Sequence, residues 1–73
     1  MNEALKAQAQ KLLQVAEELE KSAQHARIAA NHFNSGEVPK GCAHTLATEG
    51  HVHMANDLIK EVAKAHSLKA ILT

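Results

Sequence analysis

Five of the six histidines in this 73-residue chain, and its only cysteine, lie between residues 25 and 53. Histidine is the commonest metal ligand in proteins and the one side chain whose ordinary pKa lies near neutrality. The cluster therefore predicts metal binding, a protonation-sensitive contact, or polar side chains that are hydrogen-bonded within a core. The candidate residues are His25, His32, Cys42, His44, His51 and His53.

Two of these histidines lie at the centre of the apolar face expected for a second helix. His44 and His51 are seven residues apart, which is two helical turns, in line with Leu58. Buried imidazoles need hydrogen-bond partners, and the same two rings are the leading candidates to bind Zn, Ni, Cu or haem. The partners that the sequence offers are Thr45, Thr48, Asn31 and a second copy of the chain.

Another pair with the same spacing lies on the first helix. His25 and His32 are expected away from the centre of its apolar face, in a strip with Ile28 that would meet another subunit or solvent. If the chain turns near residue 38, His51 comes level with His25, and His44 comes level with His32.

The remaining donors are weaker candidates. His53 follows Glu49 by four residues and precedes Asp57 by four, a spacing that suits either a shared zinc ion or a solvated helix face. Cys42 is two residues from His44, so the pair diverges on a helix but could chelate Zn²⁺ or Cu⁺ in an extended segment. Otherwise Cys42 is expected to be a small buried hydrophobe.

Residues 2 to 33 are expected to form one long amphipathic helix without an interrupting glycine or proline. Its apolar residues recur at alternating spacings of three and four, and we expect this stripe to pack against the second helix. The stripe consists of Leu5, Leu12, Ala16, Leu19, Ala23, Ala26, Ala30 and Phe33, and it is widened by Leu13, Val15 and Ala29.

A turn is expected at about residues 34 to 40, followed by a second helix from about 41 to 72. Gly36 suits the left-handed position that ends a helix, and Pro39 suits the first turn of the next helix. Gly50 costs about 1 kcal/mol relative to alanine inside a helix, so it could mark a kink, a close helix approach, or a helix start near Thr48 instead of near Lys40. The predicted stripe consists of Ala47, Met54, Ala55, Leu58, Ile59, Val62, Ala65 and then Leu68 or Leu72.

These elements predict a single all-α domain over residues 1–73, an antiparallel helical hairpin of two long helices. One hairpin buries a single seam, so a homodimer that forms a four-helix bundle is the expected completion. We expect a histidine-lined half near the turn, where alanines leave room for imidazoles. The other half is expected to be aliphatic, with Leu5, Leu12 and Leu19 meeting Leu58, Val62 and Leu72.

Composition argues against several classes of protein. Eight basic residues balance eight acidic ones, and tryptophan and tyrosine are absent, so nucleic acid and anionic membranes are not expected partners. No stretch is long and apolar enough for a membrane span, and one cysteine cannot form an internal disulfide. A cytoplasmic protein is expected.

The sequence also lacks the motifs C-x-x-C, H-E-x-x-H and Glu-x-x-His. A hairpin this small has little concavity to hold a substrate, so an enzyme is not expected. The leading hypothesis is a small structural or interaction protein that acts through homo-oligomerisation. The alternative is a metal-binding bundle that uses His44 and His51 with Cys42 or other histidines. A third hypothesis is a pH-responsive oligomer that loosens when these two rings are protonated below about pH 6.

Overall fold

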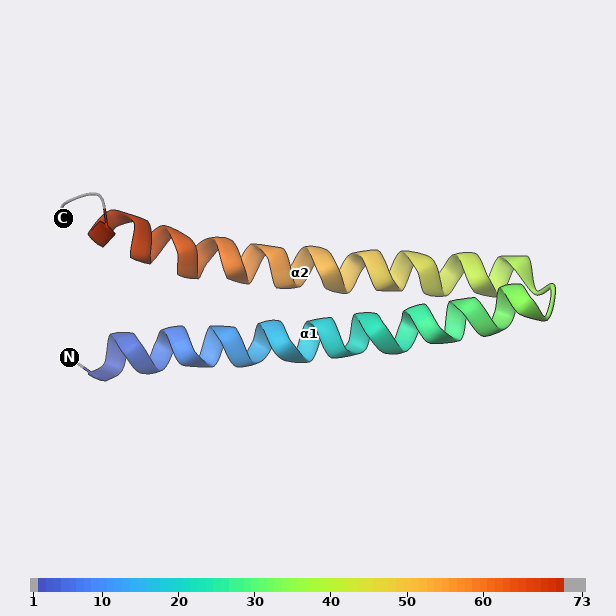
Figure 1. The fold of residues 1–73 in the computed structure, drawn as a ribbon, viewed down its shortest axis with the longest axis horizontal. Helices are drawn as coiled ribbons and strands as arrows, with labels where there is room; N and C mark the ends of the chain where they lie inside the picture. Colours follow the sequence, from blue (N-terminus) through green and yellow to red (C-terminus); the bar gives the residue numbers. More distant parts are fainter. Residues whose placement is uncertain (1, 71–73) are drawn as a thin grey trace.

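The computed structural model describes the backbone of residues 2–70 and the side chains of residues 3–66. Two helices of 33 residues each, α1 (Asn2–Asn34) and α2 (Val38–Ala70), run antiparallel and side by side (Figure 1). The molecule measures 54 × 21 × 13 Å, so it is a flat layer one helix thick. The predicted all-α antiparallel hairpin is confirmed.

The turn between the helices is shorter than expected and occupies residues 35–37. Gly36 has a φ of 77°, the left-handed conformation that glycine adopts without steric cost. The amide of Glu37 donates to the His32 carbonyl at 2.8 Å, and the amide of Gly36 donates to the Phe33 carbonyl at 3.0 Å. This pair of bonds is a Schellman motif, which satisfies the last carbonyls of α1.

Helix α2 begins at Val38 and continues without a break through Gly50. Pro39 lies in its first turn, where the missing amide hydrogen costs nothing. A helix start near Thr48 was therefore a wrong prediction, and Cys42 and His44 do not lie in an extended segment. A close helix approach does not explain Gly50 either, because a Cβ atom at that position would meet nothing within 4 Å.

The two helices meet along one face of each, and the residues of that face follow a seven-residue repeat. The shielded residues of each helix recur at alternating spacings of three and four, the pattern of coiled-coil packing. On α1 these seam residues are Gln8, Lys11, Val15, Glu18, Ser22, His25, Ala29 and His32. On α2 they are Gly41, His44, Thr48, His51, Ala55, Leu58, Val62 and Ala65.

The predicted packing of the apolar stripe of α1 against α2 was right for Val15 and Ala29 at its edge but wrong for its centre. Leu5, Leu12 and Leu19 are all exposed, and so is Phe33 at the other end of the stripe. The seam lies roughly 100° away around the helix axis, where polar side chains bond between the helices. Among the described residues, the buried apolar side chains are Val15, Ala29, Ala55 and Val62.

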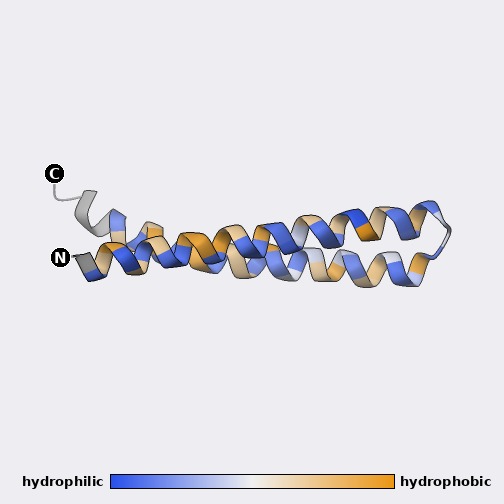
Figure 2. Cartoon of the chain, turned by 90° about the horizontal axis from the view of Figure 1, so that it is seen from below, coloured by the Kyte–Doolittle hydropathy of each residue, from blue (hydrophilic) through white to orange (hydrophobic). Residues whose placement is uncertain are grey.

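Hydropathy is therefore mixed along the whole hairpin. Figure 2 shows hydrophilic and hydrophobic residues alternating along both helices. Over the residues described, neither helix combines the length and the apolar character needed to cross a membrane. The predicted stripe positions Leu68 and Leu72 lie outside the residues whose side chains are described.

Candidate functional site: a histidine ladder

Four histidines stack in the seam between the middle of the hairpin and the turn. The ring centroids of His25 and His44 lie 5.1 Å apart. His25 also stacks on His51, and His44 also stacks on His32, both with centroids 5.5 Å apart. In space the rings follow the order His51, His25, His44, His32, alternating between α2 and α1. We call these four residues the histidine ladder.

The ladder follows from equal spacing in two antiparallel helices. His25 and His32 are two turns apart on α1, and His44 and His51 are two turns apart on α2. The predicted levels are confirmed, because His51 stacks on His25 and His44 stacks on His32. The predicted direction of His25 and His32 was wrong, since both face α2 instead of another subunit or solvent.

A hydrogen bond joins the two central rings. The Nδ1 atoms of His25 and His44 lie 2.9 Å apart. A neutral imidazole has one N–H donor and one acceptor nitrogen, whereas an imidazolium has two donors and no acceptor. One Nδ1 must therefore carry the hydrogen and the other must be unprotonated, which assigns different protonation patterns to two neighbouring rings.

A glutamate binds the histidine at each end of the ladder. His51 Nδ1 lies 2.6 Å from Glu18 Oε2, and His32 Nδ1 lies 2.8 Å from Glu37 Oε2. The hydrogen bond from His51 holds the pKa of Glu18 below its usual range, and Lys21 lowers it further. The pKa of Glu37 is lowered in the same way, by the hydrogen bond from His32.

The cations nearest to these glutamates lie outside the ladder. Lys21 Nζ is 3.8 Å from Glu18 Oε1, and Lys40 Nζ is 3.3 Å from Glu37 Oε1. The hydrogen bond from Lys40 is the second cause of the lowered pKa of Glu37. Beside Glu18, a groove runs between the helices and carries three more carboxylates, those of Glu17, Asp57 and Glu61.

Hydroxyl groups pack against the ladder but do not bond to its rings. Ser22 is only 5% exposed and donates to the Thr48 carbonyl across the seam at 2.9 Å. The Thr48 hydroxyl donates to the His44 carbonyl, and the Thr45 hydroxyl donates to the Gly41 carbonyl. Thr45 and Thr48, two of the four partners that the sequence offered, therefore do not bond to the rings; His44 is bonded to His25, and His51 is bonded to Glu18.

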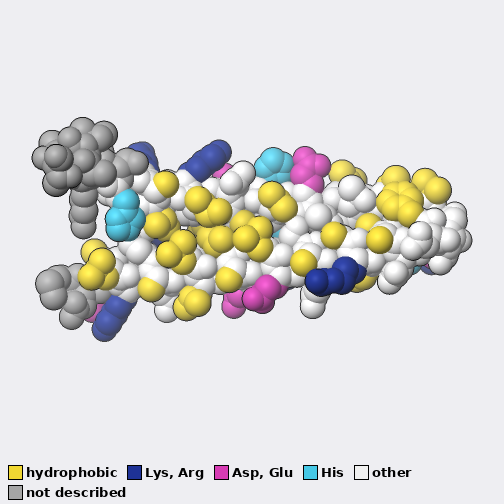
Figure 3. Space-filling model, viewed as in Figure 1, with side chains coloured by type: hydrophobic (Ala, Val, Ile, Leu, Met, Phe, Trp, Pro, Cys, Tyr) yellow, Lys and Arg dark blue, Asp and Glu magenta, His cyan; other side chains and the backbone are white. Residues whose placement is uncertain are grey.

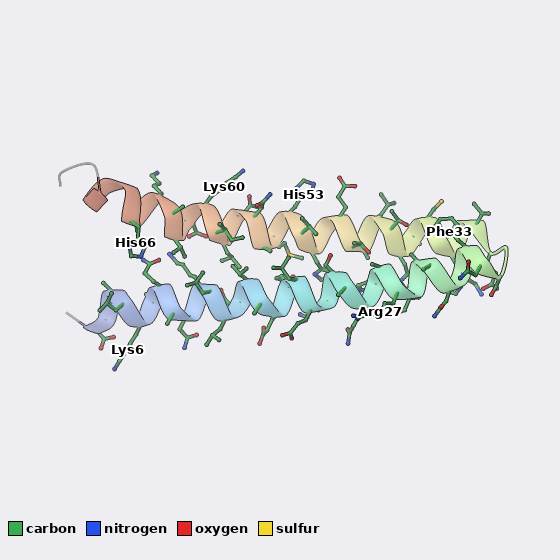
Figure 4. All side chains as sticks on the ribbon, viewed as in Figure 1. Lys6, Arg27, Phe33, His53, Lys60 and His66 are labelled. Atoms are coloured by element: carbon green, nitrogen blue, oxygen red, sulfur yellow. The ribbon has the colours of Figure 1, made fainter. Side chains whose placement is uncertain are left out.

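Cys42 and His53 lie apart from the ladder. Cys42 is a free, exposed thiol. His53 is paired with Glu49 one turn away at 3.3 Å, with both side chains about two-thirds exposed, and Figure 4 shows it directed away from α1. Among the residues that the structure describes, no three His, Cys, Asp or Glu side chains converge as a metal ion would require. Metal ligation by these residues stays a prediction from the sequence.

Fold and site together define an all-α antiparallel hairpin whose seam is lined by stacked histidines between two glutamates. No family model matches the chain, and no curated protein sequence or solved structure matches it significantly.

Proposed function

We propose that this protein is a small non-enzymatic helical module whose helix pairing loosens when the histidine ladder is protonated. The observation that carries this proposal is the 2.9 Å contact between the Nδ1 atoms of His25 and His44. That contact holds one hydrogen between two nitrogens, so it cannot persist once both rings are charged.

The direction of the expected pH effect follows from the number of hydrogens that the contact between His25 and His44 can hold. In the unfolded chain each imidazole takes up a proton near its ordinary pKa of about 6.5. In the folded chain the second proton on the pair breaks the hydrogen bond, which costs about 1 kcal/mol, and places two positive rings in contact. Repulsion at this separation adds about 1–3 kcal/mol. Two charged rings at this contact therefore oppose helix pairing, and we expect acid to weaken it.

The end rings of the ladder respond differently to acid. A proton on His51 faces Glu18, and a proton on His32 faces Glu37, so each of these charges is matched by a carboxylate. Their rings nevertheless stack on the central pair from both sides. Among the residues described, no carboxylate pairs with either central ring, so a second charge on the central pair would be unmatched.

A change of a few kcal/mol in the free energy of unfolding is large for this hairpin. Within the described part of the chain, four apolar side chains are buried, and none of them is larger than valine. Small domains have a narrow margin of stability even with a full core. Protonation of the central pair is thus enough to shift the balance between paired and separated helices.

The test compares the free energy of unfolding of two histidine variants between pH 8 and pH 5. His44→Asn keeps a polar atom near the Nδ1 position but cannot take up a proton. We expect the wild-type protein to lose roughly 1–3 kcal/mol over this range and His44→Asn to lose much less. His53→Asn, which removes an exposed histidine outside the ladder, should keep the wild-type slope. A slope that His44→Asn retains in full would contradict the proposal.

A further inference from the structure

We infer that the exposed apolar stripe of α1 binds a second copy of this chain, so that two hairpins stack face to face as a four-helix bundle. The stripe lies on a different side of α1 from the histidine ladder. It consists of Leu5, Ala9, Leu12, Ala16, Leu19, Ala23, Ala26, Ala30 and Phe33, recurring at alternating spacings of four and three.

The stripe has the pattern of a packing surface, but only Phe33 at its end lies against α2, where its ring is close to Gly41. Leu5, Leu12, Leu19 and Phe33 are 44–56% exposed although they lie on one seven-residue repeat, whose remaining member is Ala26. Figure 3 shows apolar side chains gathered along both helices on this face, with charged side chains mainly at its margins. A continuous apolar surface with a polar border is typical of a protein–protein contact.

The stripe is complementary to itself when two copies run antiparallel about a two-fold axis at Leu19. In that register Leu12 lies opposite Ala26, Leu5 lies opposite Phe33, and Ala16 lies within one residue of Ala23 of the other copy. Leu19 thus meets its own copy at the axis, alanines lie on either side of it, and the large side chain of Leu12 faces the small one of Ala26, which lets the two helices approach closely. A two-fold interface requires such self-complementarity, because each patch must bind its own copy.

The same axis also brings the two hairpins into full overlap. Helix α1 spans residues 2–34, so Leu19 lies within about one residue of its midpoint. The broad face measures 54 by 21 Å, on the order of 1,000 Å² per copy, and a stable interface needs roughly 800 Å² per partner. The formal net charge of zero adds no repulsion between copies.

The first experiment measures the oligomeric state by sedimentation at pH 8, well above the ordinary pKa of an imidazole, so that it is separate from the proposed pH response. The wild-type chain should sediment at twice its 7.9 kDa mass. Leu19→Glu should weaken the dimer at least about 100-fold, because two buried leucines are replaced by two charges. Leu46→Glu is the matched control, since Leu46 is 70% exposed and outside the stripe, and it should leave the dimer intact.

The second experiment tests the register and does not depend on the folding of Leu19→Glu. In a Cys42→Ala background, Leu19→Cys should crosslink two chains rapidly with a short bis-maleimide. Gln24→Cys, an exposed position outside the stripe, should crosslink at least about tenfold more slowly. A helical wild-type monomer at 100 μM, equal loss of the dimer in both glutamate variants, or equal crosslinking at the two cysteines would each overturn the inference. None of these results bears on the pH response of the ladder.

Discussion

His25 Nδ1 and His44 Nδ1 face each other at 2.9 Å across the seam between the two helices. Two nitrogens of the same kind can approach this closely only with one hydrogen between them. The contact therefore depends on the protonation state of both rings. Glu18 and Glu37 pair with the outer rings, whereas the two central rings are hydrogen-bonded to each other.

Removing the carboxylate at one end of the ladder should change stability at neutral pH but not in strong acid. Because the pKa of Glu18 is lowered in the fold, its contribution is complete above the ordinary glutamate pKa of about 4.3 and is lost as the pH falls through the lower folded value. Glu18→Gln should therefore be less stable than wild type at pH 7, and the difference should vanish near pH 2. Chemical unfolding at several pH values measures this difference. The matched control Glu49→Gln removes an exposed pair and should change little at any pH; a Glu18→Gln difference that persists at pH 2 would count against the ion pair.

The hydroxyl of Ser22 should contribute more to the free energy of unfolding than the hydroxyl of Thr45. Ser22→Ala removes a buried hydrogen bond between the helices, and we expect a loss of about 1 kcal/mol in the free energy of unfolding. Thr45→Ala removes a hydroxyl that bonds only within its own helix, so its loss should be smaller. Urea unfolding at pH 8 compares them, and an equal loss in both would show that the contact between helices adds nothing.

Two glycines of α2 should respond in opposite ways to the same substitution. Gly50→Ala should stabilise the protein by up to about 1 kcal/mol, because helix propensity improves and the added methyl group meets open space. At Gly41 a Cβ atom would lie 2.8 Å from the Phe33 ring. Gly41→Ala must displace that ring, so we expect no gain or a net loss. Thermal unfolding at pH 8 ranks the two variants, and a higher midpoint for Gly41→Ala than for Gly50→Ala would contradict the contact with Phe33.

The helices and the turn were predictable because their signals are local. An uninterrupted run to residue 33, a glycine that accepts a positive φ, and a proline suited to a first helical turn place the hairpin within a few residues. The level of each histidine also followed, since an antiparallel turn near residue 38 determines which residues lie opposite one another. Because the histidines have the same seven-residue spacing in both helices, the two pairs come level with each other.

The side of α1 that faces α2 was not predictable from hydropathy. Helix α1 carries two parallel seven-residue repeats, and the more apolar of them, which includes Leu12 and Leu19, is not the one that meets α2. Polar residues of the other repeat bond across the seam instead, as Ser22 and His25 do. The spacing of apolar residues shows which face of a helix favours burial. It does not show whether that face packs against the same chain or against another molecule.

The most direct test of the central claim is the tautomeric state of His25 and His44, read from the ¹⁵N chemical shifts of the imidazole nitrogens. At pH 7.5 we expect one of these two rings to carry its hydrogen on Nδ1 and the other to have an unprotonated Nδ1 that accepts it, with both Nδ1 atoms protonated by pH 5 as the helices loosen. His53, exposed and outside the ladder, serves as the reference within the same spectrum. Two rings that both carry their hydrogen on Nε2 at pH 7.5 would leave no proton between the facing nitrogens, and that result would contradict the ladder as the source of the pH response.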